Sequence, residues 1–419
     1  MSIPVRHLPV IQNWDCHSCG NCCRELEVSV TDEERRRIEA LGWDDDPELK
    51  WVRLFVRYGP WWARRTRLNH RPDGRCVFLS DDNRCRIHER AGADAKPLAC
   101  RLFPFVLSPA GNHWRVGLRY SCPSAAEGNG RPLPQHETEL LQATRLVEQA
   151  EEFEARNVPP PPLQRGQSVD WPDLLRFVQA LSDLLADRRD RVERRLRKCL
   201  ALAAICRDAR FDKITGGKLV EFLRVVCEGL DAEVPVEPTA LPRPGWVGRM
   251  LFRQLLAILV RKDRGENRGP ATRNGLTRFY AAWRFTRGSG TVPRVNGFLP
   301  ATTFAQVEAA NGPLPPAAEE ILERYYQVKV GSLQFCGPLN FRLPFWDGFA
   351  SLAVTMPAIL WLTRALADGP REQALARALS VVDDHFGYNR VLASRRVRFS
   401  LWALAKRGEL ERLIAWYSR

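Results

Sequence analysis

The chain has 419 residues, of which 45% are hydrophobic and 27% are charged. That composition is typical of globular proteins and excludes a disordered polypeptide, and the length allows two or three domains with a sizeable core. The 63 basic and 49 acidic residues give a formal charge of +14, which favours acidic partners, although an arginine-rich composition alone produces the same surplus.

The N-terminal residues contain no recognisable targeting signal. Residues 1–10 hold two prolines and no long apolar run, unlike a secretory signal peptide. The most apolar segment, residues 349–362, is shorter than the roughly 20 residues of a spanning helix, and Pro357 interrupts it. We therefore expect a buried helix there, no transmembrane segment, and a location in the reducing cytoplasm.

Four cysteines within residues 16–23 predict a metal site. Thiolates at short spacing are what zinc and iron–sulfur clusters require, and a disulfide framework is not expected without a secretory signal. Cys16, Cys19 and Cys22 reproduce the first three steps of the bacterial ferredoxin run, so the fourth ligand is expected from far along the chain, as at Cys122. Cys22 and Cys23 would point to opposite sides of an extended segment, so one of them would serve a second centre or stay free.

Four further cysteines in the first third of the chain complete a set of eight thiols, namely Cys76, Cys85, Cys100 and Cys122. Eight thiols suffice for two four-coordinate centres, or for one cluster and one zinc ion, and fewer ligands remain if some are merely buried. We predict at least one tetrathiolate centre, with a [4Fe–4S] cluster favoured over zinc.

The segments between the first cysteines are predicted to be short. Thr31 and Glu34 form a capping box that starts a helix ending near Gly42. Residues 44–46 are three aspartates and suggest an exposed turn. Residues 51–68 combine tryptophans with arginines, a pattern on which bases can stack, but we expect a helix at the edge of the core with snorkelling arginines.

A metal-clamping hairpin is predicted around Cys76 and Cys85, with strands at residues 76–79 and 85–88 and a turn at residues 81–83. With so many thiols present, direct ligation by His88 is not expected. Arg101 follows Cys100 and is expected to offset the charge of a cluster. Alternation over residues 114–120 predicts a further strand that leads to Cys122.

The order of these motifs resembles the YkgJ-type cysteine-cluster family, which is described as zinc- or iron-chelating and includes flagellin lysine N-methylases. The resemblance covers roughly residues 14–123 and rests on CxxCxxCC, then Cys-Val-Phe-Leu, Cys-Arg-Ile-His and Lys-Pro-Leu-Ala-Cys-Arg-Leu-Phe-Pro-Phe, then a final cysteine. It implies that the eight cysteines are the family's metal ligands. It also implies, less directly, methyl transfer from S-adenosylmethionine to an acidic or flagellar protein.

The rest of the chain is predicted to be helical. A helix over residues 137–156 and a stiff linker at residues 159–162 precede the helices expected at residues 170–187, 188–207, 218–229, 247–262, 276–287, 317–328, 348–367, 371–386 and 399–417. Cys199, Cys206, Cys227 and Cys336 are expected to pack in this region. The arginines at 188, 189, 191, 194, 195 and 197 suggest a solvated face, with a docking surface for an acidic partner as the alternative.

The sequence thus predicts a mainly α protein with a small cysteine-rich metal-binding head with short β-hairpins and a larger all-helical domain. The expected divisions are residues 1–125, a helix and proline-rich linker at residues 126–165, and residues 166–419. No glycine-rich phosphate fingerprint and no nucleophile elbow is present, so S-adenosylmethionine would need another kind of pocket. Besides the methylase-like iron–sulfur protein, a zinc-stabilised binding module without catalysis and an electron-transfer protein remain open, and nucleic acid is not the expected partner.

Overall fold

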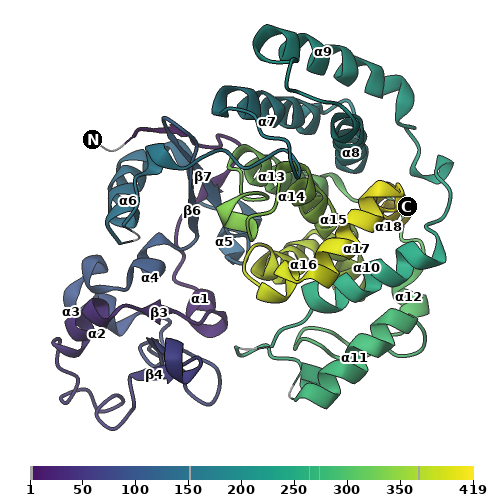
Figure 1. Ribbon diagram of the computed structural model, residues 1–419. Helices are drawn as coiled ribbons and strands as arrows, with labels where there is room; N and C mark the ends of the chain where they lie inside the picture. Colours follow the sequence, from purple (N-terminus) through teal and green to yellow (C-terminus); the bar gives the residue numbers. More distant parts are fainter. Residues whose placement is uncertain (1–2, 151, 264, 273, 367–368) are drawn as a thin grey trace.

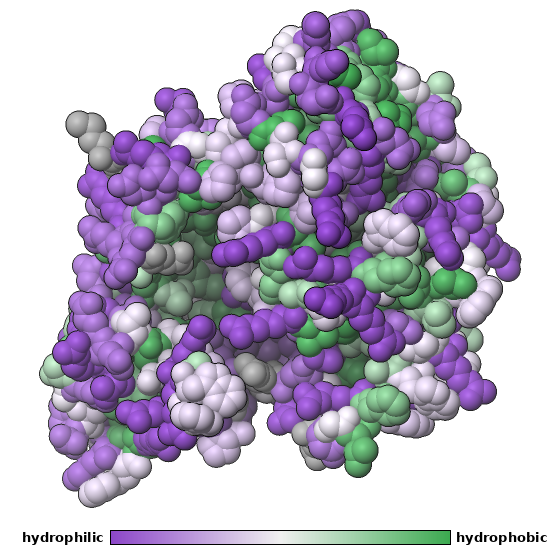
Figure 2. All heavy atoms as spheres, in the orientation of Figure 1, coloured by the Kyte–Doolittle hydropathy of each residue, from purple (hydrophilic) through white to green (hydrophobic). Residues whose placement is uncertain are grey.

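The computed structural model describes residues 3–150, 152–263, 265–272, 274–366 and 369–419. An N-terminal head with short strands and helices lies beside a larger body built from helices, as Figure 1 shows. This is the mainly α architecture that the sequence predicts. Figure 2 shows that one face of the molecule is hollowed between the head and the body, with both hydrophobic and hydrophilic side chains around the hollow.

The strands of the head are all short. They are β1 (Val5–His7), β2 (Asn13–Trp14), β3 (Ser29–Val30), β4 (Phe55–Tyr58), β5 (Arg65–Leu68), β6 (Phe105–Pro109), β7 (Trp114–Leu118) and β8 (Arg131–Pro132). They form three small sheets, with the strand orders β1-β7-β6, β2-β8 and β3-β5-β4. The β6–β7 hairpin pairs Phe105 with Leu118 and confirms the strand predicted before Cys122.

Short helices connect these strands. They are α1 (Asn21–Glu25), α2 (Asp32–Glu39), α3 (Arg86–Ala91), α4 (Leu98–Leu102), α5 (Pro123–Glu127) and α6 (Glu137–Ala150). The capping box predicted for α2 is confirmed, because the Glu34 backbone N–H donates to the Thr31 hydroxyl and the Thr31 N–H donates to the Glu34 carboxylate. The same carboxylate accepts a hydrogen bond from the Leu98 N–H at 2.7 Å, so α2 also holds the start of α4.

The helix predicted over residues 51–68 is wrong. Strands β4 and β5 occupy this segment, and Arg67 of β5 pairs with Val56 of β4. Gly59 and Pro60 interrupt any helical period, and the alternation in β5 places Leu68 inside and Arg65 outside. Trp61 and Trp62 lie at the tip of the hairpin, where they are exposed instead of packing at the edge of the core.

The exposed turn predicted at residues 44–46 is only partly confirmed, because two of the three aspartates are exposed and the third is not. Asp46 is buried, and its carboxylate accepts a hydrogen bond from Arg86 at 2.9 Å. A buried carboxylate is stable only with such a partner, and the pair fastens the segment after α2 to the start of α3.

The body consists of twelve described helices. They are α7 (Trp171–Ala186), α8 (Val192–Asp208), α9 (Gly216–Glu233), α10 (Trp246–Leu259), α11 (Gly275–Arg287), α12 (Phe304–Glu308), α13 (Pro316–Gly331), α14 (Phe345–Ala353), α15 (Thr355–Ala365), α16 (Arg371–His385), α17 (Arg395–Lys406) and α18 (Glu409–Ser418). Helices α13, α14 and α15 lie in the middle of the body, and the other helices surround them (Figure 1). The predicted N-cap Asp170 is confirmed, because its side chain accepts from the Asp173 N–H.

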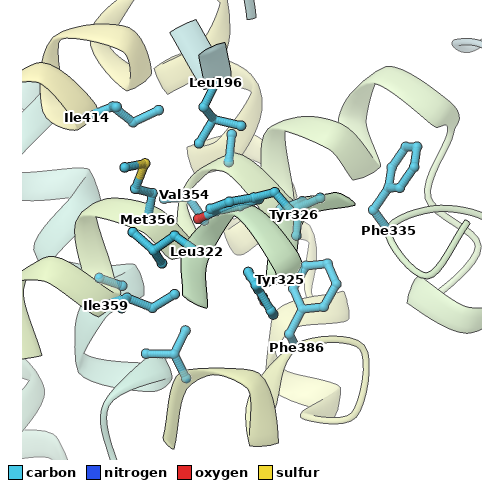
Figure 3. Packing of buried hydrophobic residues seen from close by; sticks show 14 of the residues in the cluster. Leu196, Leu322, Tyr325, Tyr326, Phe335, Val354, Met356, Ile359, Phe386 and Ile414 are labelled. Atoms are coloured by element: carbon cyan, nitrogen blue, oxygen red, sulfur yellow. The ribbon is translucent and has the colours of Figure 1, made fainter. Parts of the chain in front are cut away.

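The core of the body is one continuous hydrophobic cluster. Figure 3 shows its centre, where Tyr325 and Tyr326 of α13 lie among aliphatic side chains from α8, α15 and α18. Cys199, Cys206 and Cys336 are buried in it, as predicted, and Cys227 packs against it. Residues of the head also enter this cluster, namely Leu118, Tyr120 and Cys122.

Two long predicted helices are each divided in the structure. Gly408, with φ of +65°, separates α17 from α18, because a left-handed residue ends a helix and glycine adopts that conformation freely. Val354 separates α14 from α15. The segment Phe345–Ala365 has the length and composition of a membrane span, but 89% of its apolar window is buried inside the protein, so it forms a core element.

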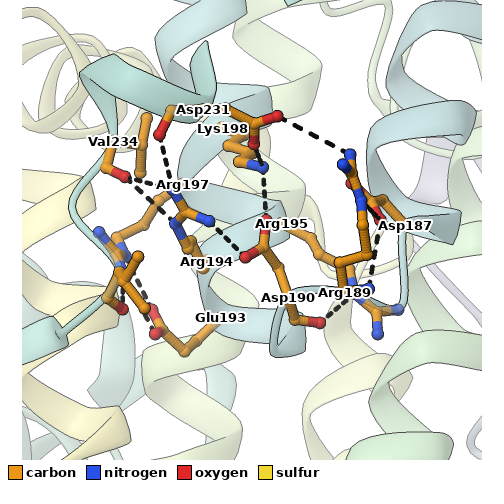
Figure 4. A network of polar contacts seen from close by, with 11 residues as sticks. Asp187, Arg189, Asp190, Glu193, Arg194, Arg195, Arg197, Lys198, Asp231 and Val234 are labelled. Carbon is orange, nitrogen blue, oxygen red and sulfur yellow. Dashed lines mark hydrogen bonds and ion pairs between the residues drawn. The ribbon is translucent and has the colours of Figure 1, made fainter. Parts of the chain in front are cut away.

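The solvated face predicted for the arginine cluster is confirmed for Arg188, Arg189 and Arg191, which are exposed before α8, and is wrong for the cluster's three arginines within α8. Arg194, Arg195 and Arg197 are buried, and Figure 4 shows their contacts with acidic side chains and carbonyl groups. Arg197 binds the Glu193 carboxylate at 2.7 Å, and Arg195 donates to the Asp190 carbonyl at 2.7 Å. The partners come from α8 itself, from the loop before it and from the C-terminal end of α9, which is why burial is tolerated.

Candidate metal centre

Five of the eight predicted thiols line one cavity of about 310 Å³ in the head. Cys22 and Cys23 come from α1, Cys76 from an isolated β-bridge with His70, Cys85 from the N-cap of α3, and Cys100 from α4. Four separate segments therefore deliver sulfur atoms to one space. Such convergence is what a thiolate-bound metal centre requires.

Backbone contacts bring these segments together. The Cys76 N–H donates to the Cys23 carbonyl at 2.7 Å, and the Arg86 N–H donates to the Phe78 carbonyl at 2.9 Å. Residues 76–79 are not the strand that was predicted, because the ladder there consists only of the single bridges His70–Cys76 and Leu79–Cys85, and the returning segment is helix α3. The expected proximity of Cys76 and Cys85 is nevertheless present, since both line the cavity.

Cys22 and Cys23 do not point to opposite sides, as was predicted for an extended segment. Both lie in helix α1, which begins after Gly20 in the left-handed conformation at φ of +70°. Their sulfur atoms are 4.0 Å apart and both face the cavity. The two neighbours can therefore contribute to the same centre.

The remaining three cysteines lie outside the cavity. Cys16 and Cys19 are exposed, whereas Cys122 is buried at the start of α5. Burial raises the pKa of the Cys122 thiol, and the nearby Cys19 thiol raises it further. The Asn21 amide donates to the Ser121 carbonyl at 3.2 Å and holds the cysteine loop near Cys122. The structure thus separates Cys16, Cys19 and Cys122 from the five cavity thiols.

A family model matches the part of the head that carries the cysteines. Residues 15–123 match the family model "CxxCxxCC: Putative zinc- or iron-chelating domain". The matched segment, residues 15–123, is called the CxxCxxCC domain from here on. No curated protein and no solved structure matches the chain. The match covers all eight candidate cysteines and leaves the helical body outside it.

The thiols of the CxxCxxCC domain differ in their readiness to ionise. A hydrogen bond from the Cys23 thiol lowers the pKa of Cys22 to about 7, against the burial of the site and with help from the nearby Lys96. The same hydrogen bond, together with burial, raises the pKa of Cys23. Burial raises the pKa of Cys76 to about 12 and also raises the pKa of Cys100. Of Cys22, Cys23, Cys76 and Cys100, Cys22 is therefore the thiol that ionises most readily, and the thiolate is the form that binds a cation.

Cationic and polar groups complete the wall of the cavity. Lys96, His70 and Arg119 line it together with the thiols. His70 donates from Nε2 to the Leu26 carbonyl at 3.1 Å, while its buried Nδ1 has no hydrogen-bond partner among the described residues. Sequence reasoning missed these three residues, and only Lys96, which lies in the motif before Cys100, gave any signal.

Two side chains considered from the sequence lie elsewhere. His88 is exposed on α3 and does not line the cavity, so it remains outside the candidate site. Arg101 binds Asp94 at 2.6 Å.

The helical body reaches the CxxCxxCC domain through α1 and Arg119. The side chain of Glu25 of α1 is 5% exposed, accepts from the Asn267 side chain at 2.6 Å and lies 3.5 Å from the Lys262 ammonium group. Lys262 binds Asp384 at 2.8 Å, and Asp384 binds Arg119 at 3.1 Å. A continuous chain of charges therefore connects the helix that carries Cys22 and Cys23 with α16 and with the wall of the cavity.

In the described part of the chain, no three Cys, His, Asp or Glu side chains stand at distances that would hold a single ion. The five thiols surround a space rather than a point. Their donor chemistry fits zinc or iron, since thiolates are the ligands that both centres use, and the orphaned His70 nitrogen in the same wall shows that the polar surface is incompletely satisfied.

Proposed function

We propose that the CxxCxxCC domain holds an iron–sulfur cluster on thiolates from Cys22, Cys23, Cys76, Cys85 and Cys100. The observation that carries the proposal is the convergence of five thiols on one cavity of about 310 Å³. A tetrathiolate cluster needs four ligands, and a space of this size is at the lower end of the roughly 300–1,000 Å³ of small-molecule pockets, well beyond the need of one ion.

The charges around the cavity support this occupant. Lys96 and Arg119 bring positive charge to its wall, and Arg119 is held by Asp384 and by the Tyr388 ring, whose centroid lies 3.8 Å from the guanidinium carbon. Fixed cations compensate the negative charge of several thiolates in a space of low dielectric constant. The residues of this chain would thus supply the sulfur ligands of the cluster and offset their charge.

Zinc is the second candidate, and one distance favours it. A tetrahedral zinc ion with Zn–S bonds of about 2.3 Å places its sulfur ligands about 3.8 Å apart. The Cys22 and Cys23 sulfur atoms are 4.0 Å apart, close to one edge of such a tetrahedron. A zinc-loaded domain would be a binding module that the metal stabilises.

The reaction that we propose for a cluster-loaded protein is methylation of a lysine in an acidic or flagellar protein, with S-adenosylmethionine as methyl donor. The support is the resemblance of the cysteine motifs to a family that includes flagellin lysine N-methylases. A cluster with an open coordination position can bind such a cofactor. Arg119, at the side of the cavity nearest the body, is the residue of this chain suited to a carboxylate of the cofactor or substrate.

Purification without oxygen, with iron, sulfide and zinc quantified per chain, tests the centre. We expect brown protein with iron and sulfide in equal amounts, loss of both in Cys76→Ser and Cys100→Ser, and retention in Cys16→Ser and in the matched control Cys227→Ser. Colourless protein that contains zinc would contradict the iron–sulfur cluster and support the zinc site. Loss of metal in Cys16→Ser to the same extent as in Cys76→Ser would contradict the assignment to the cavity.

The reaction is tested separately with labelled S-adenosylmethionine, the cluster-loaded chain and acidic or flagellar proteins. We expect label on substrate lysines and none with Cys76→Ser. A cluster that is reduced reversibly while no label is transferred would instead indicate electron transfer.

A further inference from the structure

Helix α11 exposes an apolar face to solvent. Leu276, Phe279, Tyr280 and Trp283 are 83%, 74%, 57% and 46% exposed, and their spacing places them on one side of the helix. The opposite side packs into the body, where Phe285 contacts the rings of Phe304 and Trp361. Exposed apolar side chains of this size gathered on one helix mark an interaction surface, since single ones are scattered on ordinary surfaces.

The chain segments around this face are rich in arginine, and the nearby Glu308 is paired with Arg253. Residues 267–307 include six arginines and neither aspartate nor glutamate. Residues 385–408, which include α17, hold five arginines, one lysine and again no acidic residue. Both helices pack against α10, and the groove of about 200 Å³ between them is lined by Arg261, Arg278 and Arg396 without a carboxylate.

The arginines of α11 itself are not neutralised by carboxylates. In the described part of the chain, Arg278, Arg284 and Arg287 form no ion pair with an acidic group, whereas the arginines of α8 do. Arg284 donates to the Thr291 carbonyl at 3.0 Å, and Arg287 lies over the Trp283 ring at 5.7 Å. Arg287 therefore lies on the same side of α11 as the apolar face, whereas Arg278 lies toward the groove with α17.

We propose that α11 is a membrane-contact helix that lies on the surface of an anionic phospholipid bilayer. Helices of this kind combine arginine or lysine with tryptophan, phenylalanine and leucine and lie in the plane of the interface. Anionic headgroups attract the arginines, and the aromatic rings sit at the level of the headgroups.

The shape and chemistry of the face favour lipid over other partners. Helix α11 lies at the edge of the body in Figure 1, and the same corner of Figure 2 exposes green and purple side chains side by side on a convex surface. Leu276, the most exposed residue of the face, has no group that stacks on a base or binds a phosphate, so nucleic acid gains nothing from it. Transfer of the Leu276 side chain from water to the acyl chains of a bilayer is favourable.

Sedimentation with vesicles tests this inference on the full-length chain. The vesicles contain phosphatidylcholine alone or phosphatidylcholine with one-third phosphatidylglycerol. We expect partitioning to the anionic vesicles to exceed that to the neutral ones by about ten-fold or more, and to fall as salt rises. Two double variants should each reduce partitioning by about ten-fold. Leu276→Ser with Phe279→Ser keeps the charge, and Arg278→Gln with Arg287→Gln keeps the apolar face.

The matched control is Val220→Ser with Val225→Ser, which removes two half-exposed apolar side chains from α9 and should leave partitioning unchanged. Circular dichroism confirms that the surface variants are folded. Absence of binding to anionic vesicles, an equal loss in the α9 control, binding of a single-stranded oligonucleotide in place of vesicles, or a dimer that the α11 variants dissociate would each overturn the inference.

Discussion

Asp383 is the buried carboxylate that joins the head to the helical body, and its replacement gives the sharpest test of the fold. Its side chain is 0% exposed, accepts a hydrogen bond from the Tyr120 N–H at 2.5 Å and lies 2.7 Å from the Lys329 ammonium group, which is 1% exposed. Lys329 also donates to the Leu118 carbonyl at 3.1 Å and to Gln334 at 2.7 Å. Burial lowers the pKa of Lys329, and the Asp383 charge opposes that effect.

Asp383→Asn removes the negative charge and leaves a buried ammonium group with neutral acceptors only. Breaking a buried pair in this way costs about 3–5 kcal/mol. For a domain of a few hundred residues this cost corresponds to a decrease in Tm of about 5–15 °C. Lys329→Met should cost a similar amount, because it leaves the Asp383 carboxylate without its cation.

Thermal unfolding followed by circular dichroism measures these changes. We expect the double variant Asp383→Asn with Lys329→Met to lose clearly less than the sum of the two single losses, because no uncompensated charge remains. Glu221→Gln, which removes an exposed carboxylate 2.6 Å from Arg224, is the matched control and should leave Tm unchanged. Additive losses in the double variant, or an unchanged Tm in Asp383→Asn, would refute the reasoning.

Three further predictions follow from single side chains. Burial, with Arg115 and His113 nearby, lowers the pKa of His7 from 6.5 to about 3. The free energy of unfolding should therefore be at its full value above pH 6.5 and fall as the pH decreases toward 3, by at most about 1.4 kcal/mol per pH unit. Urea titrations across this range should show a smaller loss in His7→Gln than in wild type, and identical profiles would contradict the assignment. Glu34→Ala removes the hydrogen-bond partner of the Thr31 N–H and of the Leu98 N–H. It should lower the free energy of unfolding by about 0.5–2 kcal/mol and lower the metal content, because α4 carries Cys100. Glu33→Ala, next to it on the exposed side of α2, is the control. Gly117→Ala places a Cβ against Gln334 and Ser332 at the junction of β7 with the body and should lower Tm. Equal Tm values for Gly117→Ala and wild type would contradict this prediction.

Local signals in the sequence predicted much of the secondary structure. The caps at Thr31 and Asp170 and the alternation at residues 114–120 depend only on neighbours a few residues away, and the structure confirms them. The segment at residues 51–68 failed because its tryptophans and arginines were assigned to a helix, although pairing with β3 decided its conformation. Strand pairing is a long-range contact that composition does not reveal.

The buried arginines of α8 show a similar limit. A run of arginines indicates a solvated face by composition, yet Arg197 is fully buried because Glu193 stands one turn before it and the carbonyl of Val236 lies within 3.5 Å. Only the packed structure supplies the acceptors that make burial of a guanidinium group tolerable.

By itself the sequence determined that eight thiols lie in the first third of the chain, that their spacing suits zinc or iron, and that a helical body follows. The tertiary structure decided which thiols meet: the bond from the Cys76 N–H to the Cys23 carbonyl and the helical conformation of α1 bring five of them to one cavity and leave Cys16, Cys19 and Cys122 outside it. The physical reason is that spacing along the chain restricts where neighbouring sulfur atoms can point, whereas the meeting of distant segments depends on backbone hydrogen bonds and packing formed only when the whole head folds.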